Sequence, residues 1–443
     1  MRIAVIGGGI SGLSSAYLTL KEAKKRNIAI DLYIFEKENK LGGTISTIFR
    51  DGFICECGPN GFLNSKKETM DLIKDLNLEN KLLVSDKESK KRYVYDGHRM
   101  WKIPEKPIEF LSSGYISFKG KLRILSEFFI LPKDIENESV ADFVRRRLGD
   151  EAAEKLIDPM VRGIYAGDIE KLELKSAFGR IKELENKYGS LFKAMFKLKR
   201  GGAPPGYLSS FDTGLYRLIE SLETQISGRI IKGEEVLGIR KKDKFWLVKT
   251  RNAELSFDKV ILSIPAYKLK EIYRPVSGLC EKIVYQPLNV VHLGYKLKNI
   301  PTKPDGFGFI SLRVARTNIL GAIFSSNMFK NRAPRGYTLI SAMIGGAFKN
   351  EVRELGDEEV LSLAINDINQ ILNTRNCPEF IYHARHNNAI PNYNTGYSKI
   401  RDEIFNIIYK EEGLFLCGNA FFGVGVNDTI KRAKEISNIV LDL

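Results

Sequence analysis

Apolar and polar positions change their period along the chain, and these changes outline its elements. Near both ends, short apolar runs of strand type alternate with helical patterns. Arg2–Ile6 is such a run at the start. Leu414–Cys417 is its counterpart near the end, followed by a glycine-rich turn and a helix from about Thr429 to Leu441. Because residues 105–200 carry mostly helical periodicity instead, the pattern predicts a mixed α/β fold with a helical insertion.

Turn-forming residues mark two boundaries in the middle of the chain. The run Gly201–Gly206 is rich in glycine and proline, which is typical of a linker. A β-rich block follows at 228–264 and ends before Pro265. Its expected strands are Arg229–Lys232, Trp246–Thr250 and Val260–Ile264.

The segment Ile181–Arg200 has apolar residues at helical spacing, with lysines between them. Such a basic amphipathic helix fits two situations. It can lie against an anionic membrane, or it can face the protein core and turn its lysines toward solvent. Residues 105–200 hold 19 Lys and Arg against 16 Asp and Glu, so their net charge of only +3 counts against a concentrated basic patch for a membrane.

The composition is that of a globular protein, with 43% hydrophobic and 28% charged residues. A length of 443 residues suggests two or three structural units. Five dispersed cysteines indicate a reducing compartment, so we expect a cytoplasmic protein. We interpret Cys55 and Cys57 as small buried residues of a strand. The chain opens directly with a strand and has only short apolar stretches, so we expect neither a signal peptide nor a membrane span.

The formal charge of +15 permits nucleic acid, an anionic membrane surface or an anionic small substrate as partner, and selects none of them. No motif with interleaved aromatic residues indicates RNA or DNA, so we expect no nucleic-acid partner. His383, His386 and Cys377 lack a compact ligand spacing. We therefore assign no metal.

A glycine-rich motif follows the first strand. Gly7–Gly12 has the sequence GGGISG and leads into a helical pattern, which is the GxGxxG fingerprint in its required strand–turn–helix context. Gly7 allows the tight turn, Gly9 lets the backbone approach a pyrophosphate, and Gly12 lets the helix pack on the strand. The phosphates are expected at the helix N-terminus, where free N–H groups favour negative charge.

A second strand, at 30–35, ends in Glu36, whose carboxylate is placed to accept hydrogen bonds from ribose hydroxyls. Both NAD and FAD use this arrangement. The choice of FAD comes from Leu41–Thr44 and Glu56–Gly61, which resemble flavoenzyme extensions of the fingerprint. Near the other end, the glycine-rich run Gly418–Asp428 opens the last helix, whose N-terminus can stabilise a reduced flavin.

With these motifs at both ends, the chain resembles the FAD-dependent protoporphyrinogen and coproporphyrinogen oxidases over essentially its full length. The most specific shared runs are Ile157–Asp168 and Cys417–Asp428. Met343–Ala347 is a further match. Tyr397 stands where relatives often have histidine, so no role of that histidine transfers.

The resemblance implies a Rossmann-type FAD-binding domain of the amine-oxidase-like kind, a β-rich substrate domain and a helical membrane-binding domain. We expect the FAD domain at 1–80, 207–265 and 400–443. The substrate domain is expected at 81–104 and 266–399, and the membrane-binding domain at 105–206. The implied location is the cytoplasm, with peripheral contact to the inner face of the cell membrane. A homodimer is also expected.

The implied reaction is oxidation of protoporphyrinogen IX to protoporphyrin IX in haem biosynthesis. Six electrons leave the porphyrinogen in three flavin cycles, and molecular oxygen is the expected acceptor, giving hydrogen peroxide. A hydride leaves a bridge carbon for flavin N5, and the pyrrole N–H protons depart without a strong protein base. No catalytic side chain is therefore assigned, and the protein mainly positions and desolvates its substrate.

The resemblance also implies binding residues. Arg92 falls at the position of the propionate-binding arginine, where a guanidinium can hold a carboxylate with two hydrogen bonds. Phe307, Gly308 and Met343 match positions near the macrocycle. The expected FAD contacts are Gly7, Gly8, Gly9, Ile10, Ser11, Gly12, Glu36, Lys37, Gly42, Gly43, Thr44, Gly58, Pro59, Asn60, Gly61, Val236, Gly418, Asn419, Val424, Gly425 and Val426.

Three alternatives stay open at this point. Coproporphyrinogen III could replace protoporphyrinogen IX as substrate. An amine oxidase or a desaturase could share the same FAD fold, although Asn419 stands where amine oxidases usually have glutamate. A basic binding protein with a nucleotide fold and no redox activity is the alternative of a different class.

Overall fold

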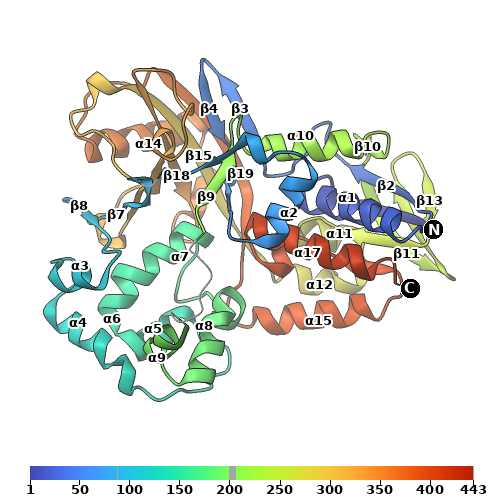
Figure 1. Cartoon of the computed structure of the whole chain (residues 1–443), viewed down its shortest axis with the longest axis horizontal. Coiled ribbons are helices and arrows are strands. Elements are labelled where there is room, and N and C mark those ends of the chain that lie inside the picture. Colours follow the sequence, from blue (N-terminus) through green and yellow to red (C-terminus); the bar gives the residue numbers. More distant parts are fainter. Residues whose placement is uncertain (87, 199–205, 443) are drawn as a thin grey trace.

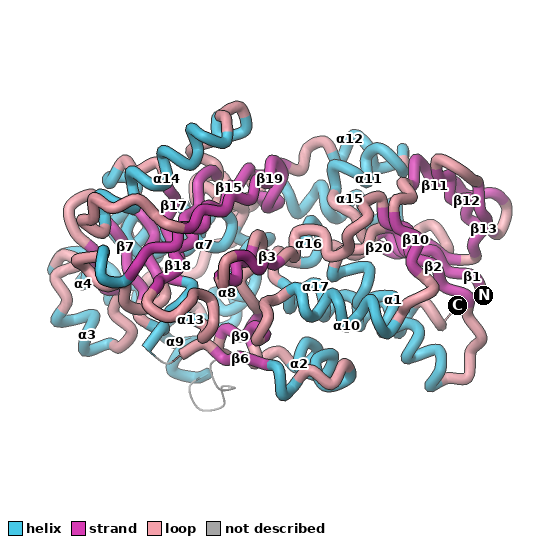
Figure 2. Tube along the Cα trace, turned by 90° about the horizontal axis from the view of Figure 1, so that it is seen from above, coloured by secondary structure: helices cyan, strands magenta, loops and turns pink. Residues whose placement is uncertain are grey.

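The computed structural model describes residues 1–86, 88–198 and 206–442. A parallel five-stranded sheet joins both ends of the chain, with the strand order β10-β2-β1-β14-β20. Figures 1 and 2 show both termini side by side near this sheet. Its strands are β1 (Arg2–Ile6), β2 (Asp31–Glu36), β10 (Ile230–Lys232), β14 (Lys259–Leu262) and β20 (Leu414–Leu416).

The alternating side chains of β1 are buried on both faces of this sheet. Ile3 and Val5 belong to one hydrophobic cluster with the inward residues of α1 (Ile10–Lys25), α10 (Tyr216–Gln225) and α17 (Val426–Ile439). Ala4 and Ile6 belong to another, with a three-stranded sheet and α11 (Ala266–Ile272). That sheet comprises β11 (Val236–Lys242), β12 (Phe245–Thr250) and β13 (Glu254–Phe257). Layers on both faces explain why β1 reads as a continuous apolar run.

A seven-stranded sheet with the order β19-β15-β18-β17-β16-β7-β8 forms the second part. Helix α14 (Asp357–Ile371) covers one of its faces, as Figure 1 shows. Strand β7 pairs in parallel with β16, although more than 200 residues separate them. The strands are β7 (Arg92–Tyr95), β8 (Met100–Lys102), β15 (Val284–Lys296), β16 (Gly308–Ser311), β17 (Ile319–Phe324), β18 (Tyr337–Gly345) and β19 (Phe380–Asn392).

The third part is helical and lies between β8 and residue 198. Its core contains buried charges: Arg147 donates to Glu127 and Glu185, and all three side chains are fully buried. The principal helices are α3 (Pro107–Ser112), α4 (Phe118–Leu125), α5 (Val140–Leu148), α7 (Asp158–Tyr165), α8 (Leu174–Tyr188) and α9 (Leu191–Leu198). Among the described residues, no helix combines the length and apolar character of a membrane-crossing segment.

The mixed α/β class is confirmed, and two expected elements need correction. The helix predicted at Ile181–Arg200 is two helices over its described residues, 181–198, because Gly189 adopts a φ of 74° and ends α8. The last helix begins at Val426, three residues before the predicted Thr429. The predicted linker at 201–206 lies outside the described residues except for Gly206. The division into three domains stays a prediction.

Smaller elements connect these parts. The hairpin β3–β4 and the three-stranded sheet of β5, β9 and β6 come from chain segments outside the two large sheets and contribute residues to the site. Their bounds are β3 (Thr47–Arg50), β4 (Phe53–Glu56), β5 (Phe62–Leu63), β6 (Leu82–Val84) and β9 (Leu208–Phe211). Cys55 on β4 and the following Cys57 are buried, as expected for small apolar residues.

Candidate functional site

The carboxyl ends of three neighbouring strands form the centre of the candidate site. The Ser263 amide after β14 donates to the Ile6 carbonyl at 2.9 Å, and the Cys417 amide after β20 donates to Leu262 at 2.8 Å. From β1 the chain continues to β2 on one side, whereas β14 lies on the other side of β1. Such a reversal of strand order opens a crevice at the carboxyl edge of a parallel sheet.

The glycines of Gly7–Gly12 have different roles in this crevice. A Cβ atom on Gly12 would lie 1.9 Å from the Gly7 carbonyl oxygen, so the start of α1 packs directly on the turn after β1. Apart from Gly9 and its two chain neighbours, a Cβ atom on Gly9 would come no closer than 4.0 Å to any atom of the described residues. Space is therefore free in front of Gly9, and none of the described side chains caps the first turn of α1. Free N–H groups and the helix dipole there suit a pyrophosphate.

Two further glycines border the same space. The Gly42 amide donates to the Gly8 carbonyl at 2.9 Å, which places Leu41–Thr44 beside Gly9. A Cβ atom on Gly43 would lie 3.6 Å from the Gly9 Cα, and one on Gly418 would lie 3.6 Å from the Ile264 oxygen. Gly9, Gly43 and Gly418 come from three segments that are distant in sequence. Because they are glycines, no side chain covers the backbone at these three positions.

Glu36 lies at the end of β2, beside the glycine turn. Its carboxylate accepts hydrogen bonds from the amides of Gly8 at 2.7 Å and Glu38 at 2.9 Å. A carboxylate has about four acceptor positions, so it can accept a hydroxyl in addition. The Glu234 amide donates to the Glu36 carbonyl at 3.0 Å, which brings the segment leading to Val236 next to Glu36. Lys37 pairs with Glu38, and its side chain is 49% exposed.

The run Gly58–Gly61 lies close to the N-terminus of α17. Asn427 makes this connection, because its side chain accepts from the Leu63 amide at 2.8 Å and donates to the Leu63 carbonyl at 3.0 Å. Asp428 accepts from the Gly425 amide at 3.3 Å, and burial raises the pKa of its carboxyl group. The structure therefore brings Gly58, Pro59, Asn60 and Gly61 toward Val424, Gly425 and Val426.

The residues expected to contact the substrate share one face of the seven-stranded sheet. Arg92 is the β-partner of Gly308, and its guanidinium lies 5.5 Å from the centre of the Phe307 ring. Following the register across β17, Met343 lies on the same face. The opposite face, with Phe309, packs under α14. No ion pair involves Arg92 among the described residues, so its charge is available to a ligand.

Two tyrosines that the sequence analysis did not assign connect this sheet to the crevice. Tyr393 follows β19 and donates to the carbonyl of Asn419, and Tyr397 donates to the carbonyl of Ala420. Their rings stack with centroids 4.5 Å apart. Burial raises the pKa of both hydroxyl groups, so they stay neutral donors. Tyr397 therefore has a positioning role, although a histidine role could not be transferred to it.

A buried ion pair makes a second connection that the sequence did not reveal. Arg332, between β17 and β18, donates to the Glu56 carboxylate at 3.3 Å and to the Ser210 hydroxyl at 3.0 Å. Both charged side chains are at least 95% buried. Breaking a buried pair leaves a charge without a partner, which is strongly destabilising. The pair holds the segment before Gly58 against the substrate-side sheet.

The sequence matches the family described as "Flavin containing amine oxidoreductase" over residues 10–441. The chain belongs to this family. It is an FAD-dependent oxidoreductase. Free space at Gly9, Gly43 and Gly418, with the uncapped start of α1, fits the extended dinucleotide that the family uses.

Named relatives of this flavin oxidoreductase span nearly all of it. It is 31% identical to the coproporphyrinogen III oxidase of Bacillus subtilis, with 98% of this chain and 96% of the relative covered. It is 30% identical to the chloroplastic protoporphyrinogen oxidase 1 of Spinacia oleracea, with 99% and 84% covered.

Solved structures show the same fold. A crystal structure from Exiguobacterium sp. 255-15, described as a candidate protoporphyrinogen oxidase, gives a TM-score of 0.85 at 24% identity and covers 100% of this chain and 99% of that one. Reduced UDP-galactopyranose mutase gives 0.75 at 14% identity, covering 100% and 95%. Because both structures cover this whole chain, the shared fold includes its two large sheets.

The free space at Gly9 generates a test. Gly9 has φ −77° and ψ 176°, which any residue adopts, so Gly9→Val is expected to fold. Its side chain would fill the space that the pyrophosphate needs, so the purified variant should contain less than about a tenth of the wild-type FAD. Gly356→Val is the matched control, since Gly356 has φ −66° and open surroundings at the start of α14. FAD per chain and Tm are measured together; a folded Gly9→Val with full FAD would contradict this assignment.

Proposed function

We propose that this enzyme oxidises a porphyrinogen, with protoporphyrinogen IX converted to protoporphyrin IX as the main reaction. The observation that carries the proposal is Arg92, which has no ion-pair partner in the described part of the chain and lies beside Phe307, on a sheet face that adjoins a dinucleotide crevice. A carboxylated and electron-rich substrate suits a guanidinium next to an aromatic ring. Amines are cations, so a positively charged guanidinium does not suit them as a binding partner.

The proposed FAD contacts are the residues expected from the sequence, with Gly7–Gly12 at the pyrophosphate and Glu36 at the ribose. Val236 contacts the adenine end. Val424–Val426, at the N-terminus of α17, face the flavin ring. The chemistry supplied by bound FAD is a two-electron oxidation, repeated three times for each porphyrin. We further propose that oxygen accepts these electrons and forms hydrogen peroxide.

The protein itself contributes binding and exclusion of water. Arg92 holds a propionate, and Phe307, Gly308 and Met343 contact the macrocycle. His292 lies in the same sheet but is fully buried, and this burial lowers its pKa to about 4, so it is neutral and does not serve as an exposed base. The pyrrole protons leave to solvent, so positioning is the main catalytic contribution.

Coproporphyrinogen III is the second candidate substrate, because curated relatives bearing that name match as well as those named protoporphyrinogen oxidase. The deciding experiment offers the purified enzyme both porphyrinogens and a primary amine, with and without oxygen, and follows porphyrin fluorescence and peroxide. We expect porphyrin formation that depends on oxygen. Turnover of the amine alone would refute the proposal.

Arg92→Ala tests the proposed propionate contact. Loss of one charge-assisted pair should cost about 2 kcal/mol, or roughly 30-fold in kcat/KM, expressed mainly as a higher KM with FAD retained. Arg375→Ala is the matched control, since Arg375 is exposed and lies in the loop before β19. Equal kinetics of the two variants would remove Arg92 from the site.

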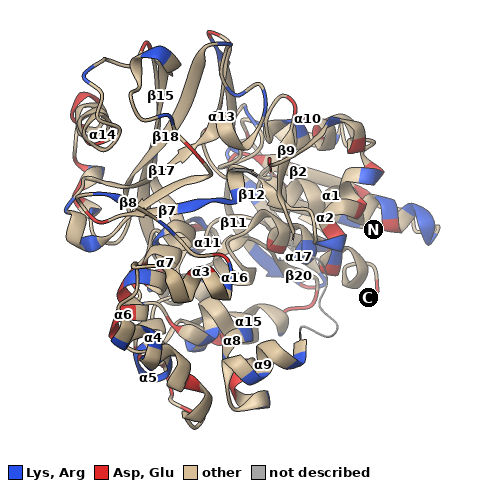
Figure 3. Ribbon diagram, turned by 60° about the vertical axis from the view of Figure 1, so that its left-hand side comes forward, with Lys and Arg blue, Asp and Glu red and all other residues tan. Residues whose placement is uncertain are grey.

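We also propose peripheral contact with a membrane, through an exposed apolar surface on α3, α4 and the turn after α4. Phe118, Leu122 and Leu125 project from one face of α4 and are 77%, 53% and 50% exposed. Ile108 on α3 and Phe129 after α4 are each 80% exposed. Figure 3 shows basic and acidic positions interleaved along the ribbons of the helical part. The exposed apolar side chains therefore distinguish this region.

The double variant Phe118→Ser/Leu122→Ser should bind vesicles containing anionic lipid at least about tenfold more weakly, since each side chain loses apolar area for insertion. Phe49→Ser is the control, because Phe49 is 76% exposed but lies on β3, in another part of the molecule. Co-sedimentation measures the binding. If all three proteins sediment equally, the surface has a different role.

A further inference from the structure

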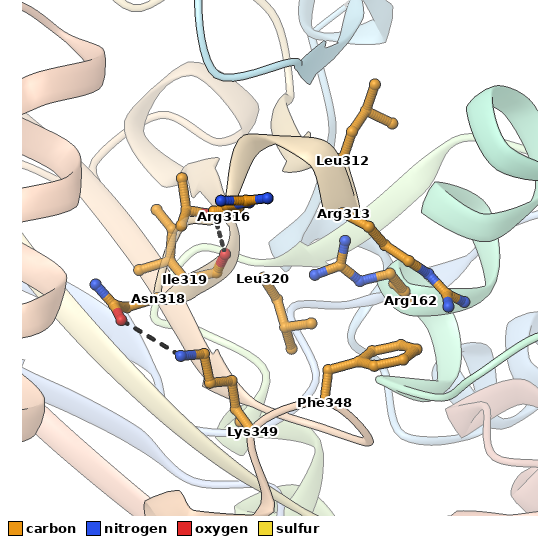
Figure 4. Close-up of a pocket in the computed structure, with 11 residues that line it drawn as sticks. Arg162, Leu312, Arg313, Arg316, Asn318, Ile319, Leu320, Phe348 and Lys349 are labelled. Carbon is orange, nitrogen blue, oxygen red and sulfur yellow. Dashed lines mark hydrogen bonds between the residues drawn. The ribbon is translucent and has the colours of Figure 1, made fainter.

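A pocket of about 280 Å³ lies where α7 meets one end of the seven-stranded sheet. Its lining contains Arg162, Arg313, Arg316 and Lys349, and none of its lining residues is acidic. Figure 4 shows these four side chains around one space, with Phe348 below the two arginines nearest α7. Four cations around a small cavity are costly unless something neutralises them.

Arg162 is the most unusual of the four. It is 91% buried, and desolvation lowers the pKa of its guanidinium. One of its terminal nitrogens donates to the Ser311 carbonyl, but its Nε has no partner. Among the described residues no carboxylate forms an ion pair with it; Asp158, which Arg313 already contacts, acts on its charge only from beyond ion-pair distance. A buried cation that keeps an unused donor at a cavity wall points to an anion supplied from outside the chain.

The neighbouring groups are arranged in fixed positions. Arg313 donates to Asp158 and lies 3.0 Å from Asp168, so its own charge is compensated. Its guanidinium stacks 4.1 Å from the Phe348 ring centre, and Arg162 lies 5.8 Å from the same centre. This packing sets the orientation of both guanidinium planes before any ligand arrives.

Arg316 and Lys349 form the outer part of the pocket. Arg316 has a φ of 53° in the turn before β17, and no ion pair involves it in the part of the chain that is described. Lys349 makes only a long contact, 3.5 Å, to the Asn318 oxygen and lies 3.9 Å from the Glu351 carboxylate, which is 59% exposed. Two largely uncompensated cations therefore stand at the opening.

We propose that this pocket binds a small oxyanion of the carboxylate or phosphate class, held between Arg162, Arg316 and Lys349. Its volume excludes a porphyrin ring but admits one such group. Two sources share this chemistry: a free anion, or a carboxylate arm of a larger ligand. The second source rests on the proposed function. Leu312 lines the pocket and lies four residues along the chain from Gly308, which we propose contacts the macrocycle. In an extended strand, four residues separate Leu312 from Gly308 by roughly 13 Å.

The test uses the FAD-loaded full chain and the double variant Arg316→Asn/Lys349→Gln. Asparagine tolerates the left-handed backbone at position 316, so folding is not at risk there. Arg162→Met is a second variant, which removes the buried charge at similar volume. Arg335→Ala is the control, since Arg335 is exposed and lies in the loop at the opposite end of β17 and β18.

Two probes are measured: the Tm against inorganic phosphate at constant ionic strength, and the affinity for coproporphyrin III from fluorescence. A phosphate-dependent rise in Tm that is absent from the double variant and from Arg162→Met indicates a free anion. About tenfold weaker coproporphyrin binding by both, without a phosphate effect, indicates a carboxylate arm. If neither probe separates these variants from the wild type and the control, the proposal is wrong. Neither probe requires turnover, so failure of the proposed oxidation would be recognised separately.

Discussion

The close packing of α1 on the end of β1 is the constraint on which the rest of the site depends. The Gly12 backbone approaches the Gly7 carbonyl so closely that no side chain fits between them. This packing aims the first N–H groups of α1 at the crevice and leaves the space at Gly9 free. Helix α17 packs on α1, so the glycine-rich run near the C-terminus is brought to the same edge.

The substrate side depends on this centre through a few polar contacts. Tyr393 and Tyr397 hold the carbonyls of Asn419 and Ala420, and the buried pair of Glu56 and Arg332 joins the segment before Gly58 to the larger sheet. These contacts place the face that carries the unpaired arginine next to the crevice. A binding surface on one sheet and a cofactor site on another can then act on one ligand.

Local signals made much of this predictable from the sequence. The fingerprint at Gly7–Gly12, the acid at Glu36 and the strand–turn–helix at the C-terminus each lie within a short stretch, so periodicity and turn chemistry were sufficient. Glu56 and Arg332 are separated by 276 positions, and nothing local marks Arg332 or its pairing with Glu56. Likewise, the sequence does not show which apolar residues of α4 are exposed, because this depends on which face of the helix packs against the rest of the protein. The division into three domains also stays a prediction.

A crystal structure of the protein purified with its flavin tests the central claim most directly. We expect a single extended FAD, with its pyrophosphate at Gly9 and the start of α1, and its ring beside Val424–Val426. Density for a dinucleotide outside the crevice between β1 and β14, or one that touches only one end of the chain, would contradict it.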